Sequence, residues 1–233
     1  MEITCPSGLR GVIREMTVAE VEMMSNPKTS DPQTLLLKSC WLETTDHGPY
    51  PDDKNVDWGN ALTADRFYTM LMIRAHSVDT MFAFSTICED CGKKFEWEFD
   101  LADLGTKPVP EESLEKWSTK SPMSADFQGD VGLKLADGPS ERAAQAMLRK
   151  KKNGLTAGAL SRVVSIDGEV SHKAKHAWWK KLTMKQMRAF LQLLDETDGG
   201  VETDIEVECP HCDEENSIAL PFRDSAFWAP PLK

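Results

Sequence analysis

Two Cys-x-x-Cys pairs constrain the fold of this chain more than any other feature of its sequence. The first pair is Cys88 and Cys91, the second is Cys209 and Cys212, and residues 92–208 separate the two pairs. Each pair follows an apolar, strand-like segment and precedes a segment in which apolar and polar residues alternate, which is typical of a β-hairpin. The same arrangement, a strand, a cysteine turn (a knuckle) and a second strand, therefore occurs twice.

Four cysteine sulfurs suit a zinc ion, which takes four thiolate or imidazole ligands at about 2.0–2.3 Å in a tetrahedron. With four thiolates no position stays open for water, so the ion is structural rather than catalytic. We therefore predict that Cys88, Cys91, Cys209 and Cys212 bind one structural zinc ion. Zinc ribbons usually bring their two pairs within about 15–20 residues. Here the ion would instead join two distant parts of the chain.

Other interpretations of the four cysteines stay open at this point. The same ligands could bind an iron–sulfur cluster, although nothing else in the sequence indicates electron transfer. A thioredoxin-like redox pair is expected at the start of a helix rather than in a hairpin, and the four thiols could also be buried without a metal. His211, inside the second pair, is a possible substitute ligand. Cys5 and Cys40 stand alone, and we expect both to be small buried side chains.

The pattern of the chain predicts a single α+β domain over residues 1–233. Its paired zinc-knuckle hairpins lie at 80–104 and 203–222. They form a zinc-ribbon-like clasp around an inserted, mostly helical region at 105–202.

Apolar periodicity and capping residues predict the individual elements. The expected helices cover residues 17–24, 32–42, 63–76, 140–152 and 183–195. The expected strands lie on both sides of the turn at 6–8 and at 80–84, 95–99, 130–135, 205–209 and 218–222, with a strand or helix end at 160–166. Residues 44–59 are predicted to form a loop and 105–126 an extended connection.

The charge of the chain argues against two classes of partner. It carries 27 Lys and Arg against 38 Asp and Glu, a formal net charge of -11, so it lacks the electrostatic character of a general nucleic-acid binder or of an anionic-membrane binder. Cations at 149–152 and 173–181 are the only features that favour nucleic acid, and at 149–152 they are expected to complement a helix dipole. No apolar run reaches the roughly 18–20 residues that span a bilayer, and residues 1–14 lack a signal-peptide core. We expect a soluble intracellular protein.

No motif in the sequence assembles a catalytic site. The chain contains no glycine-rich phosphate loop, no Gly-x-Ser-x-Gly and no His-Glu-x-x-His. His172 and His176 lie four residues apart without a matching acid, as expected of a surface pair. The apolar tail at 227–231 (FWAPP) either packs on its own domain or docks on a partner. We therefore expect no catalytic residues and no cofactor other than the metal.

Several short motifs resemble one known family. They are PSGLRG at 6–11, CWLE at 40–43, GPY at 48–50, DRFY at 65–68, FEWE at 95–98, GVET at 200–203, EVECPHC at 206–212 and LPF at 220–222. Together with the paired knuckles they resemble the base-plate protein family of T-even-like contractile-tailed phages and related prophages. The resemblance is faint across about 105–160. Asp213 replaces the glycine expected after the second pair, which predicts a looser turn there.

The resemblance implies a non-enzymatic component of the phage tail baseplate hub that binds neighbouring hub and tail proteins. It implies synthesis in the host cytoplasm and a place in the tail baseplate of the virion. No small-molecule substrate, nucleic acid or membrane is expected as a partner. The resemblance leaves open whether the protein stays in the particle or acts only as a transient hub-assembly chaperone.

Overall fold

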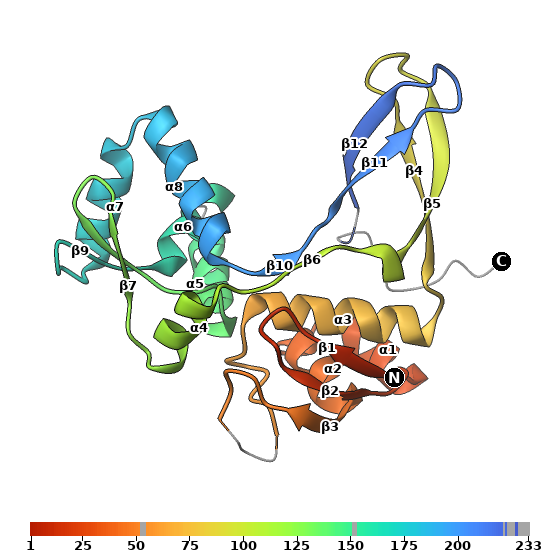
Figure 1. Ribbon diagram of the computed structural model, residues 1–233, viewed down its shortest axis with the longest axis horizontal. Helices are drawn as coiled ribbons and strands as arrows, with labels where there is room; N and C mark the ends of the chain where they lie inside the picture. Colours follow the sequence, from red (N-terminus) through yellow and green to blue (C-terminus); the bar gives the residue numbers. More distant parts are fainter. Residues whose placement is uncertain (52–54, 151–152, 221, 223–226, 228–233) are drawn as a thin grey trace.

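The computed structural model describes residues 1–51, 55–150, 153–220, 222 and 227, and its architecture is α+β, as predicted. Figure 1 shows three parts: an N-terminal part built around a long helix, a helical lobe at the opposite end of the long axis, and two hairpins that rise together. Its sheets are small and antiparallel, with two or three strands each.

The N-terminal part packs helices on a three-stranded sheet. Its elements are β1 (Glu2–Thr4), β2 (Arg10–Ile13), α1 (Val18–Ser25), α2 (Pro32–Cys40), β3 (Trp41–Asp46) and α3 (Thr63–Ser77). The predicted turn joins β1 to β2, and the predicted capping box begins α1, where Glu20 accepts a hydrogen bond from the Thr17 N–H (2.7 Å). The predicted loop at 44–59 is wrong at its start, because β3 pairs with β2 as far as Asp46.

A buried carboxylate fastens the first turn to α3. Asp65 is fully buried and accepts hydrogen bonds from the Ser7 N–H (3.0 Å), the Ser7 hydroxyl (2.5 Å) and the Tyr50 hydroxyl (2.5 Å). The Tyr50 oxygen in turn accepts from the Leu62 N–H (3.0 Å). Burial raises the pKa of the Asp65 carboxyl, and the hydrogen bonds from Ser7 and Tyr50 partly offset that rise. Three segments far apart in sequence are joined at this point.

The two hairpins are regular and antiparallel. Their strands are β4 (Met81–Ile87), β5 (Lys94–Asp100), β11 (Asp204–Glu208) and β12 (Glu215–Ala219). The inward side chains of both hairpins, among them Phe82, Phe95 and Val207, belong to the same hydrophobic cluster as the buried residues of α2 and α3. The hairpins therefore extend from the main core rather than standing apart from it.

The inserted region forms a lobe with a second hydrophobic cluster. Its elements are β6 (Thr106–Lys107), α4 (Glu111–Ser118), β7 (Met123–Asp126), β8 (Asp130–Leu133), α5 (Gly138–Arg149), α6 (Gly154–Arg162), β9 (Val163–Ile166), α7 (His172–Lys181), α8 (Met184–Thr197) and β10 (Gly200–Val201), preceded by the short helix η1 (Leu101–Asp103). Trp178, Phe190 and Leu194 are buried in this cluster. The chain enters and leaves the lobe through β6 and β10, which pair with each other.

One prediction for this region needs correction. The segment 105–126 is not only an extended connection, because it contains α4 and β7. The segment 160–166, predicted as a strand or a helix end, contains both, the end of α6 and the strand β9. The organisation of 1–233 as one domain stays a prediction, since the lobe has its own cluster of buried side chains.

Removing the Tyr50 hydroxyl should destabilise the chain. In Tyr50→Phe, Asp65 loses one of its donors and the Leu62 N–H loses its acceptor. We expect the free energy of unfolding to fall by about 1–3 kcal/mol, since buried polar groups would be left unpaired. Urea denaturation measures the change. The matched control is Tyr68→Phe on α3, expected to change stability by less than about 0.5 kcal/mol; an equal loss in both variants would contradict the role given to Tyr50.

Candidate metal centre

The four cysteines of the two knuckles come together. The Cys88 and Cys212 sulfurs are 3.6 Å apart, the Cys91 and Cys209 sulfurs are 3.8 Å apart, and all four lie within 4.8 Å of one another. Around a single zinc ion with bonds of about 2.3 Å, the edges of a regular tetrahedron of sulfurs measure about 3.8 Å. A disulfide would need about 2.05 Å. The separations therefore fit four thiolates on one metal ion.

The two knuckles have the same backbone turn. In the first, the Cys88 N–H donates to the Lys93 carbonyl (3.0 Å) and the Gly92 N–H donates to the Cys88 carbonyl (3.0 Å). In the second, Cys209 donates to Glu214 and Asp213 donates to Cys209, both at 2.9 Å. These bonds fix both sulfurs of each pair on one side of the hairpin tip.

Gly92 and Asp213 occupy equivalent positions in the two turns, and both have a left-handed backbone, with φ of 68° and 58°. Asp tolerates this conformation better than most residues because its short side chain can bond locally. The second turn is therefore closed by the same hydrogen bond as the first, and the looser turn predicted for Asp213 is not seen in its backbone bonding.

A side chain that the sequence analysis missed links the two hairpins. Asn216 lies at an inward position of β12 and is buried, and its Oδ1 accepts a hydrogen bond from the Glu89 N–H in the first knuckle (3.0 Å). Its Nδ2 donates to the Glu214 carbonyl (2.9 Å). The available signal was a polar residue where the alternation of β12 predicts an apolar one.

The pKa values of the Cys88 and Cys212 thiols differ. Backbone N–H groups of Cys91 and Asp90, together with hydrogen bonds from neighbouring thiols, lower the pKa of Cys88 to about 6 against the effect of burial. The Glu214 N–H lowers the pKa of Cys212, but burial and the neighbouring sulfurs outweigh it and raise that pKa to about 12. Four thiolates therefore form together only when a cation compensates their charge.

The other candidate ligands lie elsewhere. His211 is exposed and does not belong to the sulfur cluster, while Cys5 and Cys40 are buried thiols, as expected. Within the described residues, no other group of His, Cys, Asp or Glu side chains converges in this way.

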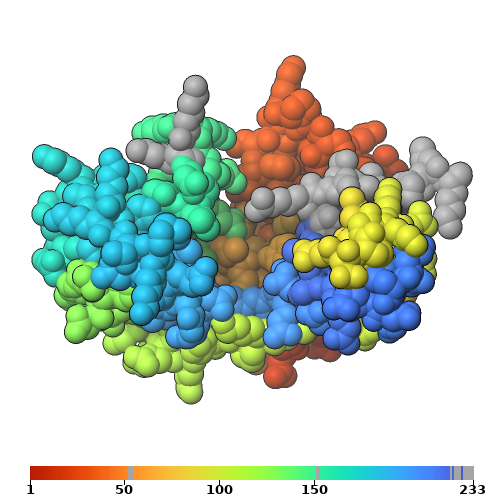
Figure 2. Space-filling view, turned by 90° about the horizontal axis from the view of Figure 1, so that it is seen from above, coloured from red at the N-terminus to blue at the C-terminus, as the bar shows by residue number. Residues whose placement is uncertain are grey.

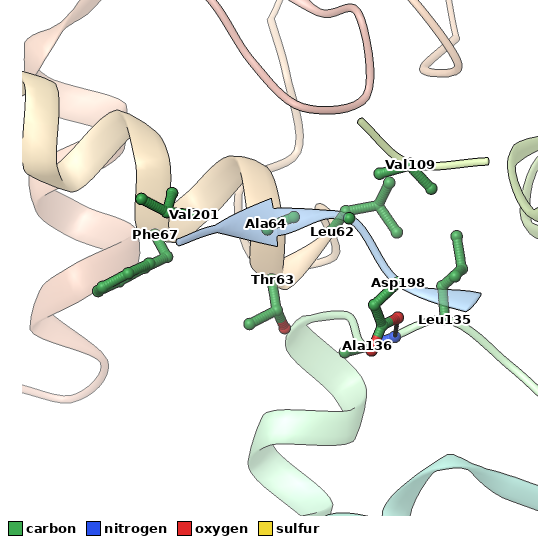
Figure 3. A pocket seen from close by; sticks show the side chains of 11 residues that line it. Leu62, Thr63, Ala64, Phe67, Val109, Leu135, Ala136, Asp198 and Val201 are labelled. Atoms are coloured by element: carbon green, nitrogen blue, oxygen red, sulfur yellow. Dashed lines mark hydrogen bonds between the residues drawn. The ribbon is translucent and has the colours of Figure 1, made fainter. Parts of the chain in front are cut away.

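A small pocket of about 200 Å³ lies at the junction between the lobe and the N-terminal part. Figure 3 shows its largely apolar lining, which includes Leu62, Phe67 and Val201. Asp198 in the lining forms an ion pair with Arg162 and accepts a hydrogen bond from the Ala136 N–H (3.2 Å). The Asp198 carboxylate is therefore already paired, with the Arg162 guanidinium and with a backbone N–H.

The described part of the C-terminal tail packs on its own chain. The ring of Phe227 is fully buried, makes edge-to-face contacts with Phe82 and Phe222, and lies under the guanidinium of Arg74 (5.1 Å). The Arg74 Nε donates to the Phe227 carbonyl (3.1 Å). The first of the two alternatives expected for the tail therefore holds at Phe227, and the remainder of the segment, 228–231, lies outside the described residues.

Comparison with known families identifies a match that covers nearly the whole chain. A family model described as T4 bacteriophage base plate protein matches residues 3–228. No curated protein and no solved structure matches the chain. Within the described residues, no helix is long and apolar enough to cross a membrane.

Substitution in the knuckle turns should separate backbone strain from metal ligation. Gly92→Val places a β-branched residue at a φ of 68°, although its Cβ would meet no atom within 4 Å. We expect a loss of about 1–2 kcal/mol from backbone conformation alone. Asp213→Gly, the matched control, should keep stability within about 1 kcal/mol because glycine is at ease in this conformation. Thermal unfolding measures the stability of both variants. Equal losses in the two variants would show that the left-handed backbone at Gly92 is not the cause of the lost stability.

Proposed function

The chain belongs to the family of T4 bacteriophage base plate proteins, and we propose that it is a structural component of a phage tail baseplate hub that binds neighbouring hub and tail proteins. The family is a structural one and typically non-enzymatic, and it implies a place in the tail baseplate of the virion. The match over nearly the whole chain is the observation that supports this proposal. The protein would be made in the host cytoplasm and bind its partners there during assembly.

We further propose that Cys88, Cys91, Cys209 and Cys212 hold a structural zinc ion. Sulfur separations of 3.6 and 3.8 Å support a single ion, since thiolates on the separate irons of a cluster would lie farther apart. Zinc in a closed thiolate site supplies no redox chemistry and no bound water. Its role would be to hold the two hairpin tips together.

A metal clasp at this place suits a scaffold protein. A two-stranded hairpin is marginally stable by itself in water, and the two hairpins here lie on either side of the inserted lobe in the sequence. The ion would join the chain before the lobe to the chain after it. The lobe could then present its surface to partners without the hairpin tips separating.

The second candidate is a transient chaperone of hub assembly that is absent from the mature particle. The net charge of -11 favours it, because strong charge keeps a free subunit soluble before it meets its partners. The two candidates differ in where the protein ends up, not in how it folds.

The content of purified particles separates the two candidates. If the chain is a structural component, quantitative mass spectrometry of purified phage or tail particles should find it at a fixed ratio to the other baseplate proteins. A structural component that makes specific contacts in the hub stays bound to the other baseplate proteins during purification. If particles assemble only when the chain is present and yet do not contain it, the structural role is contradicted and the chaperone is supported.

Metal content and stability should depend together on each cysteine of the site. Elemental analysis of the purified protein should find one zinc per chain, and Cys209→Ser should release it. Because metal affinity in zinc domains is folding free energy on the order of 10 kcal/mol, the melting temperature should fall by about 10 °C or more. The matched control is Cys40→Ala, a buried cysteine outside the site, which should keep the zinc. Stoichiometric iron, or full metal retention in Cys209→Ser, would refute the proposed zinc site.

A further inference from the structure

Charge is distributed very unevenly along this chain. Residues 138–197, which form α5 to α8 and β9, contain twelve Lys and Arg but five Asp and Glu. This segment is therefore positive although the whole chain has a net charge of -11. In contrast, residues 189–222 contain no Lys or Arg and ten Asp and Glu. The molecule carries one basic and one acidic region.

The basic region is concentrated on α7 and the start of α8. We call its exposed cations, Lys173, Lys180, Lys181, Lys185 and Arg188, the basic pole. Within the described part of the chain, none of these five takes part in an ion pair. Helix dipoles do not explain all five cations. Lys173 and Lys185 lie in the first turns of α7 and α8, where a positive charge interacts unfavourably with the dipole. Among the residues that the structure describes, the pole therefore has no ion-pair partner.

An exposed apolar side chain lies within the basic pole. Met184 is 75 % exposed and directly precedes Lys185. An apolar centre surrounded by charged groups is the usual composition of a protein–protein contact. Nucleic acid, by comparison, would meet the negative charge of the rest of the chain.

The acidic region contains a like-charged pair that costs stability. Glu208 on β11 lies directly opposite Glu215 on β12, and both are exposed, as are Glu206 and Asp204 on the same face. We call these four residues the acidic pole. Like charges that face each other across two strands are destabilising. A local conflict of this kind, left without a cation in 189–222, is typical of a surface that meets a partner.

The two poles lie at opposite ends of the molecule. Figure 1 shows α7 and α8 at one end of the long axis and β11 and β12 toward the other. Figure 2 shows the lobe and the hairpin pair as separate masses on either side of a hollow. The poles of one molecule therefore cannot neutralise each other, whereas the poles of two molecules can.

We propose that the acidic pole of one copy of this chain docks on the basic pole of a second copy, so that copies associate head to tail. The contact is heterologous, and repetition closes a ring or extends a chain. At physiological salt the Debye length is about 8 Å, so charges in contact outweigh the repulsion between the two net charges. The proposal rests on charge placement and is independent of the proposed baseplate function.

Sedimentation equilibrium of the purified full chain tests the association. At an ionic strength of about 0.05 M the mean mass should rise with protein concentration above the monomer mass of 26.1 kDa. At about 0.5 M it should return to the monomer mass, because salt screens the contact. A monomer at every concentration and salt would overturn the proposal.

Two charge-reversed variants locate the contact. One carries Lys173→Glu, Lys180→Glu and Lys185→Glu in the basic pole, and the other carries Asp204→Lys, Glu206→Lys and Glu215→Lys in the acidic pole. Each variant alone should be monomeric, because both of its poles then have the same sign. An equimolar mixture should associate again, since each variant offers the pole that the other lacks; failure of the mixture to associate would overturn the proposal.

A matched control separates the pole from the net charge. Glu15→Lys, Glu22→Lys and Glu43→Lys change the net charge in the same direction and by the same amount as the acidic-pole variant, at exposed sites of the N-terminal part outside both poles. This control should associate like the unchanged chain, with the same metal content and melting curve in all variants compared. Equal loss of association in the control would contradict a specific contact. A monomeric chain that binds a DNA duplex through Lys173, Lys180 and Lys185 would instead assign the basic pole to nucleic acid.

Discussion

The convergence of four sulfurs is the constraint on which the arrangement of the hairpins depends. Cys88 and Cys212 are 124 positions apart in the sequence, yet their sulfurs are 3.6 Å apart. Closing a loop of that length costs about 4–5 kcal/mol of chain entropy in the usual model. A thiol–thiol contact contributes far less, and the bond between Glu89 and Asn216 adds about 1 kcal/mol. The hydrophobic cluster that both hairpins share with α2 and α3 also holds them together, and the proposed zinc site, at about 10–16 kcal/mol, would by itself exceed the entropy cost by a wide margin.

The convergence of the four cysteines could be predicted from the sequence because the signal of each pair is local, while the metal itself stays a proposal. A Cys-x-x-Cys pair between two alternating segments specifies a knuckle without knowledge of the rest of the chain, and four such sulfurs specify the chemistry. Asn216 was missed because its value depends on Glu89, a residue of the other hairpin. Likewise apolar periodicity does not single out Asp65, whose hydrogen-bond partners Ser7 and Tyr50 lie elsewhere in the sequence. The hydrogen bonds of a polar group cannot be predicted from apolar periodicity when its partners are distant in sequence.

Two of the elements that were missed, β3 and α4, have local causes of their own. The strand β3 contains Glu43, Thr44, Thr45 and Asp46, and most of its side chains are exposed, so it shows no apolar alternation. Its structure comes from pairing with β2. The helix α4 has only eight residues, with Leu114 and Trp117 as its partly buried apolar contacts, which is too short for a helical period to stand out among prolines. In contrast, α8 has a capping box and a long apolar face that contains Phe190 and Leu194, and it was predicted within two residues at each end.

The proposed metal and the acidic pole reinforce each other electrostatically. Four thiolates and one Zn²⁺ leave a net charge of about -2 at the hairpin tips, at the same end of the molecule as Glu208 and Glu215. The proposed metal would therefore not neutralise the acidic pole; it would add to the negative potential there and hold in place the strands that carry the acids. Without the ion, the hairpin tips would lose part of their negative charge. The strands would also lose the rigidity that keeps the acidic side chains on one face. If both proposals hold, a cationic partner surface would bind the metal-bound hairpin pair most strongly, and the proposed metal would contribute to recognition as well as to stability.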